Sequence, residues 1–106
     1  MKNGDIVLIP FPFTDLTGNK NRTAIILVDT LEDVTVAFIS TQIHWKIETD
    51  ILLQPGSQSG LKKESLIRLS KLATIDKRLI LGRLGTIDNS TLKLVNKNLK
   101  KILKLD

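Results

Sequence analysis

The sequence predicts a mainly β protein with a C-terminal helix: a small, strongly twisted antiparallel sheet or partial barrel, with the helix packed against it. Short apolar runs rich in β-branched residues, separated by turn formers, dominate the first half of the chain. Near the end, apolar residues recur at helical spacing. The length of 106 residues suits a single domain, residues 1–106, whose core needs no disulfide or metal.

The expected strands are residues 5–9, 23–28, 34–40, 48–53 and 65–69. The proline-rich bend at residues 10–13 is expected to close the first strand. The second run is continuously apolar, which is typical of a strand buried on both faces, and a turn at residues 31–33 joins it to the third strand as a hairpin. Polar turn formers at residues 14–21 and 54–60 predict loops.

The last third of the chain is expected to hold a short helical turn, an extended segment and a helix. Thr74 or Asp76 caps the turn, and residues 79–85, bounded by glycine, are extended. Asp88 is a suitable N-cap for the helix. The apolar face of this helix consists of Leu92, Val95, Leu99 and Ile102, with Leu103 beside them. The cations that complement its dipole are Lys97, Lys100, Lys101 and Lys104.

Composition excludes several kinds of site. There is no cysteine, which excludes disulfides, thiolate metal sites and a cysteine nucleophile. The single histidine, His44, excludes a multi-histidine metal cluster, so we expect neither a metal nor another cofactor. The N-terminus lacks the features of a signal peptide, and no apolar run approaches the roughly 20 residues that span a bilayer. We therefore expect a soluble, cytoplasmic protein without a membrane partner.

Positive charge is concentrated in the second half of the chain. The formal net charge is +5, made up of −3 in residues 1–60 and +8 in residues 61–106. A basic half fits a polyanionic partner, such as RNA or DNA, or an acidic protein. Lysines that simply keep a small domain soluble explain the same numbers, and charge alone favours neither interpretation.

Several strings of residues, in order over nearly the whole chain, together point to a family. They are residues 4–15 (GDIVLIPFPFTD), Arg22 at the start of the second strand, residues 39–42 (ISTQ), residues 69–76, and residues 82–85 (GRLG) before the last helix. In this order they resemble the MazF/PemK (Kid-like) toxin family of type II toxin–antitoxin systems of prokaryotes. The resemblance implies an SH3-like partial barrel of the CcdB/MazF type, usually a homodimer. It also implies a metal-independent endoribonuclease that cuts single-stranded RNA, such as mRNA, at short sequences.

The resemblance assigns the catalytic roles to Arg22 and Ser40, with Thr41 as the adjacent hydroxyl. Two positions depart from the family pattern. Thr23 stands where the family usually has proline after the arginine, which bears on loop geometry. Ser40 stands where the family usually has threonine, so the hydroxyl is kept while the methyl group that restricts its rotamer is lost, which bears on the rate.

The implied chemistry suits these residue types. RNA is cleaved when its 2′-hydroxyl attacks the neighbouring phosphorus, and a guanidinium can bind two phosphate oxygens of the charged transition state at once. A hydroxyl from Ser40 or Thr41 can donate to a non-bridging oxygen. Arginine is a poor general base, so the group that removes the proton is not identified. Without the resemblance, Arg22 is more simply a surface ion-pair partner, and Ser40 with Thr41 a turn former.

The expected RNA-binding residues are Thr14, Asp15, Lys20, Gln42, His44, Trp45, Lys71, Lys77 and Arg78. His44 and Trp45 form a ring pair suited to stacking on an unpaired base, a contact worth about 1–3 kcal/mol, or to covering a sheet edge or a dimer interface. His44 is also a candidate acid or base. The loop at 14–21 can close over RNA. Lys71, Lys77 and Arg78, together with Lys62 and Lys63, can also form a track that binds RNA phosphates. Basic residues solvated at the surface are the commoner explanation of such a set.

Two functions remain open at this point. The first is the ribonuclease toxin, whose expected partners are single-stranded RNA and an acidic, disordered antitoxin that competes for the same groove. The alternative is an inhibitor that acts by binding protein, as CcdB-like gyrase poisons do, or a catalytically inactive relative. An arginine followed by a strand-end hydroxyl favours the nuclease, because a gyrase binder has no need of that pair.

Overall fold

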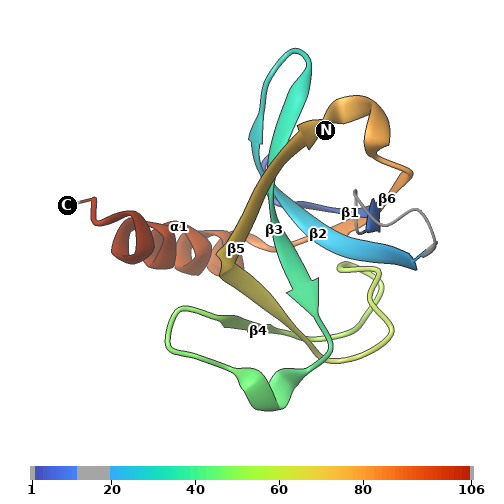
Figure 1. The fold of residues 1–106 in the computed structure, drawn as a ribbon. Coiled ribbons are helices and arrows are strands. Elements are labelled where there is room, and N and C mark those ends of the chain that lie inside the picture. The colour runs from blue at the N-terminus through green and yellow to red at the C-terminus, as the bar shows by residue number, and fades with distance from the viewer. Residues whose placement is uncertain (1, 12–19, 106) are drawn as a thin grey trace.

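The computed structural model describes residues 2–11 and 20–105, so the predicted loop at 14–21 lies mostly outside the described residues, as do Thr14 and Asp15. In the described part of the chain, six antiparallel strands form one sheet in the order β4-β5-β3-β2-β1-β6. The strands are β1 Asp5–Phe11, β2 Lys20–Asp29, β3 Asp33–Ser40, β4 Ile51–Leu53, β5 Ser65–Asp76 and β6 Gly82–Thr86. The sheet curls into a half-barrel, and helix α1 (Asn89–Leu103) packs against it (Figure 1). The prediction of a mainly β fold with a C-terminal helix is confirmed.

Strand β1 is longer than the sequence predicts. The proline-rich segment does not close it at Ile9, because the strand continues through Pro10 and Phe11, which pair with the start of β2. Strand β6 pairs with β1 only as far as Leu8, so Pro10 has a partner strand on one side only among the described residues. Proline, which lacks an N–H donor, is tolerated where a strand has one open side. The same pairing places Lys20 in β2, where a loop was expected.

The β2–β3 hairpin is confirmed, and both faces of the sheet are covered. One core cluster lies on the side of α1: Ile6, Ile25, Ala37, Ile39, Ile51, Leu53, Leu61, Ile67, Leu69, Ile87 and Val95. A second cluster lies on the other face: Val7, Ile9, Ala24, Ile26, Val34, Val36 and Ile75, with Phe38, Ala73 and Ile80 packed against it. Residues alternate between the two clusters along β1, β2 and β3, as a period of two requires. Burial on both faces explains why the centre of β2 is continuously apolar.

Strand β5 differs most from its prediction. It extends well beyond residue 69 to Asp76, whose side chain accepts a hydrogen bond from the Arg78 amide and caps the 3₁₀ turn η2 (Lys77–Leu79). Its register against β3 shifts, because Ala37 pairs with Leu72 whereas Phe38 pairs with Arg68. The extra residues bend the strand sharply (Figure 1). Such irregularities redirect side chains, and this one decides which residues of β5 reach the site described below.

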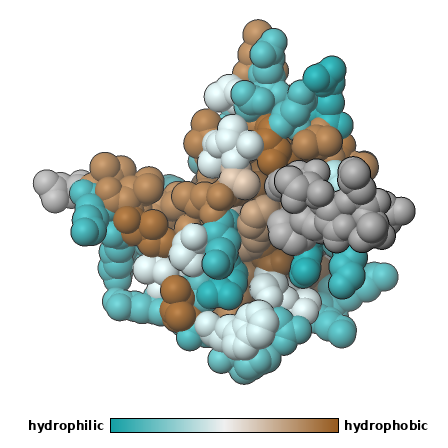
Figure 2. Space-filling model, viewed as in Figure 1, coloured by the Kyte–Doolittle hydropathy of each residue, from teal (hydrophilic) through white to brown (hydrophobic). Residues whose placement is uncertain are grey.

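Helix α1 follows the sequence prediction. Asp88 is its N-cap and accepts a hydrogen bond of 2.8 Å from the Thr91 amide. Val95 is buried, and the remaining residues of the predicted apolar face pack on the first core cluster: Leu92, Leu99 and Ile102. Leu103, predicted beside them, is instead 52% exposed. Figure 2 shows apolar side chains along the outer surface of this helix. No helix in the described residues is long and apolar enough to cross a membrane.

Candidate functional site

Arg22 and Ser40 lie at neighbouring strand ends on the same face of the sheet. Ala24 of β2 pairs with Phe38 of β3, and the same register continued by two residues sets Arg22 opposite Ser40. Because side chains alternate along a strand, both share the face of the second core cluster. They line one cavity of about 520 Å³.

We call this space the arginine cavity. Its described lining residues are Arg22, Phe38, Ile39, Ser40, Trp45, Arg68, Ser70, Lys71 and Leu72. The last four come from β5, and two of them, Ser70 and Lys71, lie in the register shift that bends the strand. All three charged members are cations, and no acidic residue occurs among the described lining residues. A cavity of this composition favours an anionic ligand.

The Ser40 hydroxyl is held by a hydrogen bond from the turn that follows β3. Its oxygen accepts a hydrogen bond of 3.0 Å from the Gln42 amide. A hydroxyl can accept and donate at the same time, so this contact fixes the oxygen and leaves the proton free to be donated. Gln42 is exposed and does not line the cavity.

Thr41 is on the other side of the strand end. It lines a different cavity, of about 420 Å³, together with Thr23, Lys62 and Lys63. The alternation of side chains along β3 therefore places Ser40, and not Thr41, beside Arg22. Thr23, at the position where the family usually has proline, pairs with Leu8 inside the β1–β2 ladder.

The predicted ring pair sits on the 3₁₀ turn η1 (Ile43–Trp45), which follows β3. Trp45 is 56% exposed and lines the arginine cavity, whereas His44 is exposed and does not line it. The two rings meet edge to face, with centroids 5.2 Å apart and planes at 63°. The exposed Trp45 ring therefore lines the same cavity as the cations, where an unpaired base can stack on it.

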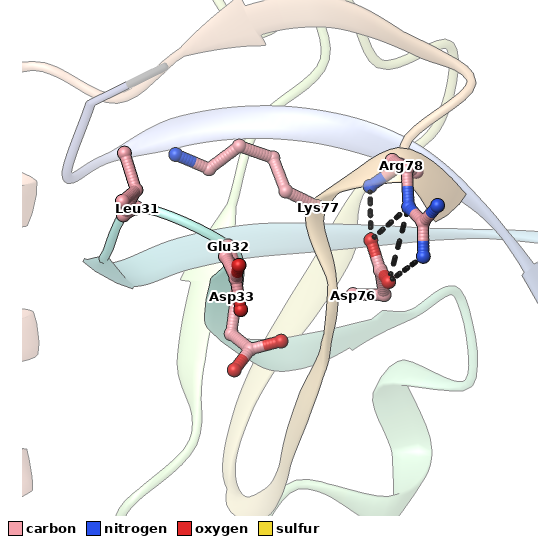
Figure 3. A pocket seen from close by; sticks show the side chains of 6 residues that line it. All are labelled: Leu31, Glu32, Asp33, Asp76, Lys77 and Arg78. Carbon is pink, nitrogen blue, oxygen red and sulfur yellow. Dashed lines mark hydrogen bonds and ion pairs between the residues drawn. The ribbon is translucent and has the colours of Figure 1, made fainter.

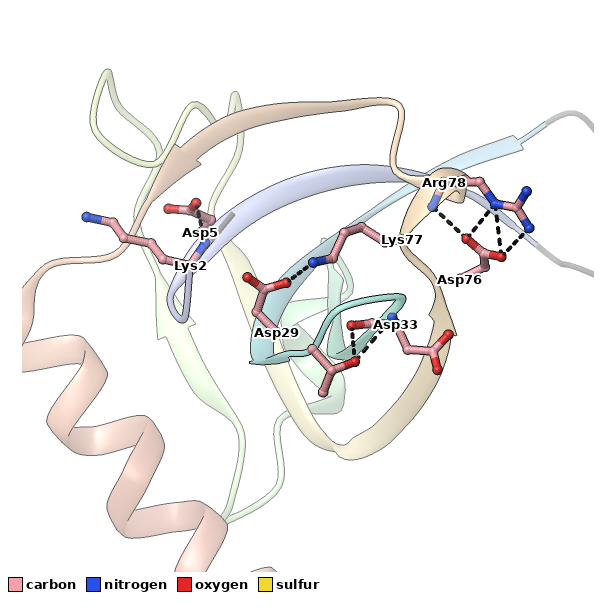
Figure 4. A network of polar contacts seen from close by, with 8 residues as sticks. Lys2, Asp5, Asp29, Asp33, Asp76, Lys77 and Arg78 are labelled. Atoms are coloured by element: carbon pink, nitrogen blue, oxygen red, sulfur yellow. Dashed lines mark hydrogen bonds and ion pairs between the residues drawn. The ribbon is translucent and has the colours of Figure 1, made fainter.

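Lys77 and Arg78 lie elsewhere. They line a second cavity of about 540 Å³, next to the turn of the β2–β3 hairpin, with Leu31, Glu32, Asp33 and Asp76 (Figure 3). We call it the hairpin cavity. Its cations are neutralised, because Lys77 Nζ lies 2.6 Å from Asp29 Oδ1 and Arg78 is paired with Asp76 at 2.8 Å (Figure 4). The hydrogen bonds from Arg78 lower the pKa of Asp76 to about 2. Lys20 is exposed on β2 and lines neither cavity.

Arg68 is the member of the site that sequence reasoning missed. Its Nε lies 3.2 Å from Oδ2 of Asp50, whose side chain is completely buried, and its own side chain is only 15% exposed. The signal in the sequence was a single charged residue within the apolar run at the start of β5, together with an acid directly before β4. Only the pairing of β4 with β5 brings them together. Among the described residues, no group of three or more potential metal ligands is assembled.

Comparison with solved structures shows the same fold in bacterial toxins. The Mycobacterium tuberculosis toxin MazF-mt6 matches with a TM-score of 0.79 at 20% identity, over 96% of this chain and 98% of that chain. An endoribonuclease in complex with its cognate antitoxin, from a mycobacterial species, matches with a TM-score of 0.77 at 19% identity, over 100% and 97%. MazE–MazF from Deinococcus radiodurans matches with a TM-score of 0.77 at 15% identity, over 100% and 97%. These likenesses confirm the expected barrel of the MazF type.

Comparison with curated protein sequences gave no match. Comparison with protein families gave a match over almost the whole chain: residues 2–103 match the PemK-like, MazF-like toxins of type II toxin–antitoxin systems. The family predicted from short strings of residues is therefore confirmed. The chain belongs to the PemK-like, MazF-like toxin family of type II toxin–antitoxin systems.

Proposed function

We propose that this toxin is a metal-independent, sequence-specific endoribonuclease that cleaves single-stranded RNA, with Arg22 and Ser40 as catalytic residues. The observation that carries the proposal is that the two residues lie on the same face of the sheet, at the ends of adjacent strands, and line one cavity. Among the described residues that line this cavity, every charged one is a cation. Two of the solved relatives are described as a toxin and as an endoribonuclease with its antitoxin, which supports the same activity.

The reaction needs no group from outside the RNA and the protein. The 2′-oxygen attacks the adjacent phosphorus, the bond from phosphorus to the 5′-oxygen breaks, and the proton lost by the 2′-hydroxyl is balanced by one gained at the leaving 5′-oxygen. The products are a 2′,3′-cyclic phosphate and a 5′-hydroxyl. Arg22 binds two phosphoryl oxygens in a bidentate manner as negative charge builds on them. The Ser40 hydroxyl donates a hydrogen bond to a non-bridging oxygen.

Base recognition is assigned to the exposed ring of Trp45, which stacks on an unpaired base at the edge of the arginine cavity. Lys71 supplies a further cation to the RNA backbone. His44 and Gln42, on the same turn but outside the cavity lining, are placed to contact flanking nucleotides.

The protein partner follows from the same charges. An acidic, disordered antitoxin segment can lie along the arginine cavity and compete with RNA, because both present negative groups to the same cations. Two solved relatives are complexes with an antitoxin or with MazE. A competition titration with the product of the neighbouring gene and a non-cleavable RNA tests this, and simultaneous binding without mutual weakening contradicts it.

A homodimer is the expected assembly. Large apolar side chains remain exposed on and after α1, including Leu94 (42%), Leu103 (52%) and Leu105 (60%). Apolar surface of this kind is more stable when it is covered by another chain. Light scattering at micromolar concentration is expected to give twice the chain mass, and a mass near 11.8 kDa contradicts the dimer.

The activity itself is tested with purified protein and a long single-stranded RNA in excess EDTA. We expect discrete cuts that leave cyclic phosphate and 5′-hydroxyl ends. Intact RNA, together with inhibition of DNA supercoiling by gyrase, would favour the CcdB-like alternative instead.

A further inference from the structure

We infer that Asn98 of helix α1 is a positioning residue for Trp45, the ring to which base stacking is assigned above. Its side-chain amide donates a hydrogen bond of 3.2 Å to the Thr49 carbonyl and so holds the backbone segment that carries Trp45. The inference rests on the proposed function, because an RNA base is taken as the ligand of Trp45. It concerns a residue outside the arginine cavity, and no motif in the sequence indicated it.

The segment that carries Trp45 buries very little surface of its own. Residues 41–48 are all exposed, including Ile43, Trp45 and Ile47, and the η1 turn contains no buried side chain. A segment with so few apolar contacts gains little to offset the entropy that is lost when it is ordered. Its position therefore depends on polar contacts with the rest of the molecule.

Backbone hydrogen bonds join the η1 turn to the start of β4 as one unit. The Lys46 amide donates to the Ile43 carbonyl at 3.3 Å, directly after Trp45. The Asp50 amide donates to the Ile47 carbonyl at 3.0 Å, and the Ile47 amide donates to Asp50 Oδ2 at 3.0 Å. We call residues 43–50 the tryptophan segment. A shift at its far end is passed on to Trp45 through these bonds.

Asn98 ties the tryptophan segment to α1. Its acceptor, the Thr49 carbonyl, lies within the turn that Ile47 and Asp50 close. Figure 1 shows the chain running from η1 to β4 on the side of α1. The other printed contact with the helix is an ion pair of 3.9 Å between Lys101 and Glu48, whose side chains are well exposed, and such pairs contribute little. Among the described residues, Asn98 therefore makes the main polar contact between α1 and this segment.

Burial makes the choice of asparagine informative. Asn98 is only 6% exposed, and Val95 is the other buried residue of α1. Asparagine is a poorer helix former than leucine, and a buried amide costs free energy unless it is hydrogen-bonded. A leucine at this position would avoid both costs and extend the apolar face of the helix. Helix stability does not account for the asparagine, whereas the bond to Thr49 does.

The sheet separates Asn98 from the arginine cavity. Helix α1 packs on the face of the first core cluster, whereas Arg22 and Ser40 share the face of the second. Asn98 is not among the described lining residues of the cavity, but Trp45 is. Asn98 therefore acts on a ligand through Trp45. It affects the affinity for a base and leaves the positive charge of the cavity unchanged.

The first experiment needs no RNA. Trp45 is the only tryptophan of the chain, so the time-resolved fluorescence anisotropy of the free protein reports on the tryptophan segment directly. Asn98→Leu removes the amide and should increase the share of the anisotropy that is lost through nanosecond motion of the indole. Asn96→Leu is the matched control, because it makes the same change at an exposed position of the same helix. Asn98→Gln, which keeps an amide donor on a longer side chain, should restore part of the wild-type signal.

The second experiment measures binding of a dye-labelled, mixed-sequence, single-stranded RNA that is methylated at every 2′-oxygen and cannot be cleaved. We expect Asn98→Leu to bind it about tenfold more weakly, within the range of one base stack. The slope of log affinity against log salt should stay at the wild-type value, because no phosphate contact is lost. An abasic oligonucleotide of the same length should bind the variant and the wild type equally. Asn96→Leu should bind both probes like the wild type.

Trp45→Ala shows whether Asn98 acts through the ring. The double variant Asn98→Leu/Trp45→Ala should bind RNA as weakly as Trp45→Ala and no more weakly, because the positioned group is already absent. Additive losses overturn the inference. Unchanged anisotropy and affinity in Asn98→Leu overturn it as well, as do equal effects in Asn96→Leu.

Circular dichroism melts establish that each variant is folded. If Asn98→Leu does not fold, Asn98→Asp repeats the test, because an ionised carboxylate has a similar shape and no donor for the Thr49 carbonyl. Asn96→Asp is then its control, with the same change of charge on the same helix. The same loss of order at Trp45 and of RNA affinity is expected, and wild-type behaviour of Asn98→Asp overturns the inference.

Cleavage of unmethylated RNA by the wild type is measured in parallel. A wild type that binds RNA without cutting it refutes the proposed nuclease, while the anisotropy and the affinities still decide the role of Asn98. A wild type that binds no RNA overturns both.

Discussion

The arginine cavity and the hairpin cavity are similar in size, at about 520 and 540 Å³, and both contain basic side chains. They differ in where the carboxylates lie. In the hairpin cavity, Asp76 shares the lining with Arg78 and pairs with it, Glu32 and Asp33 add two further carboxylates to the lining, and Lys77 pairs with Asp29. In the arginine cavity, Asp50, the carboxylate that pairs with Arg68, is buried and is not among the described lining residues.

A count of cations is therefore a poor guide to where an anion can bind. Lys77 and Arg78 were predicted to bind RNA from their charge, yet their charges are matched by Asp29 and Asp76 at short distance. Arg68, which sequence reasoning overlooked, faces a cavity that has no acidic residue among its described lining. What distinguishes the two cavities is that carboxylates share the described lining with the cations in the hairpin cavity and not in the arginine cavity.

The sharpest test of the comparison is the loss of one arginine from each cavity. Arg22→Ala is expected to fold normally and to lose RNA cleavage by about 10³-fold or more, because a preorganised cation is a dominant contribution to stabilising the transition state. Arg22→Lys should be nearly as poor, since an ammonium does not reproduce the bidentate fork. Arg78→Ala should retain the wild-type rate. The measurement is kcat/KM on a defined RNA; full activity of either Arg22 variant contradicts its catalytic role.

A second test uses the two hydroxyls at the end of β3. Ser40→Ala is expected to lower cleavage by about 10²-fold, because one donor to the transition state is removed, whereas Ser40→Thr should keep or raise it. Thr41→Ala should change little, since Thr41 lines the cavity on the other face. Single-turnover rates on the same RNA distinguish these outcomes. If Thr41→Ala is the damaging change, the hydroxyl has been assigned one residue away from its true position.

A third test measures stability after removal of one ion-paired carboxylate: Asp50, which pairs with Arg68 of the arginine cavity, or Asp29, which pairs with Lys77 of the hairpin cavity. Asp50→Ala removes the counterion of a mostly buried arginine and is expected to cost about 3–5 kcal/mol of unfolding free energy. Asp29→Ala breaks the pair with Lys77, in which both side chains are about one-third exposed, and should cost no more than about 1 kcal/mol. Urea denaturation at neutral pH measures both. Equal costs would mean that burial does not distinguish the two pairs.

The smallest effect concerns the hairpin cavity alone. Because the pKa of Asp76 is about 2, below its ordinary value of 3.8, the carboxylate favours the folded state above about pH 4, and this contribution is lost as pH falls toward 2. Arg78→Gln should raise the pKa of Asp76 toward its ordinary value and remove the part of this stabilisation that Arg78 supplies, a small loss near neutral pH because the pair is exposed to solvent. An NMR titration of the carboxyl carbon follows it, and an unchanged pKa would show that Arg78 is not the cause.

Local patterns were sufficient for much of the fold. The apolar runs located the β2–β3 hairpin, and Asp88 with the helical spacing of Leu92, Val95, Leu99 and Ile102 located α1. They failed at Pro10, where the strand continues with a partner strand on one side only among the described residues, and at Leu103, which is exposed although its neighbour Ile102 packs on the first core cluster. Both errors concern neighbours that are distant in the sequence.

Residue types at short spacing were therefore enough to predict the β-rich fold with its C-terminal helix, whereas the family and the candidate pair Arg22 and Ser40 came from a resemblance of motifs along nearly the whole chain. Tertiary structure alone decided which hydroxyl shares a cavity with Arg22, which basic residues are neutralised, and that Arg68 lines that cavity. These outcomes depend on strand register and on the irregularity in β5. A shift of one residue exchanges the two faces of a strand, and no local pattern specifies which partner residue lies opposite.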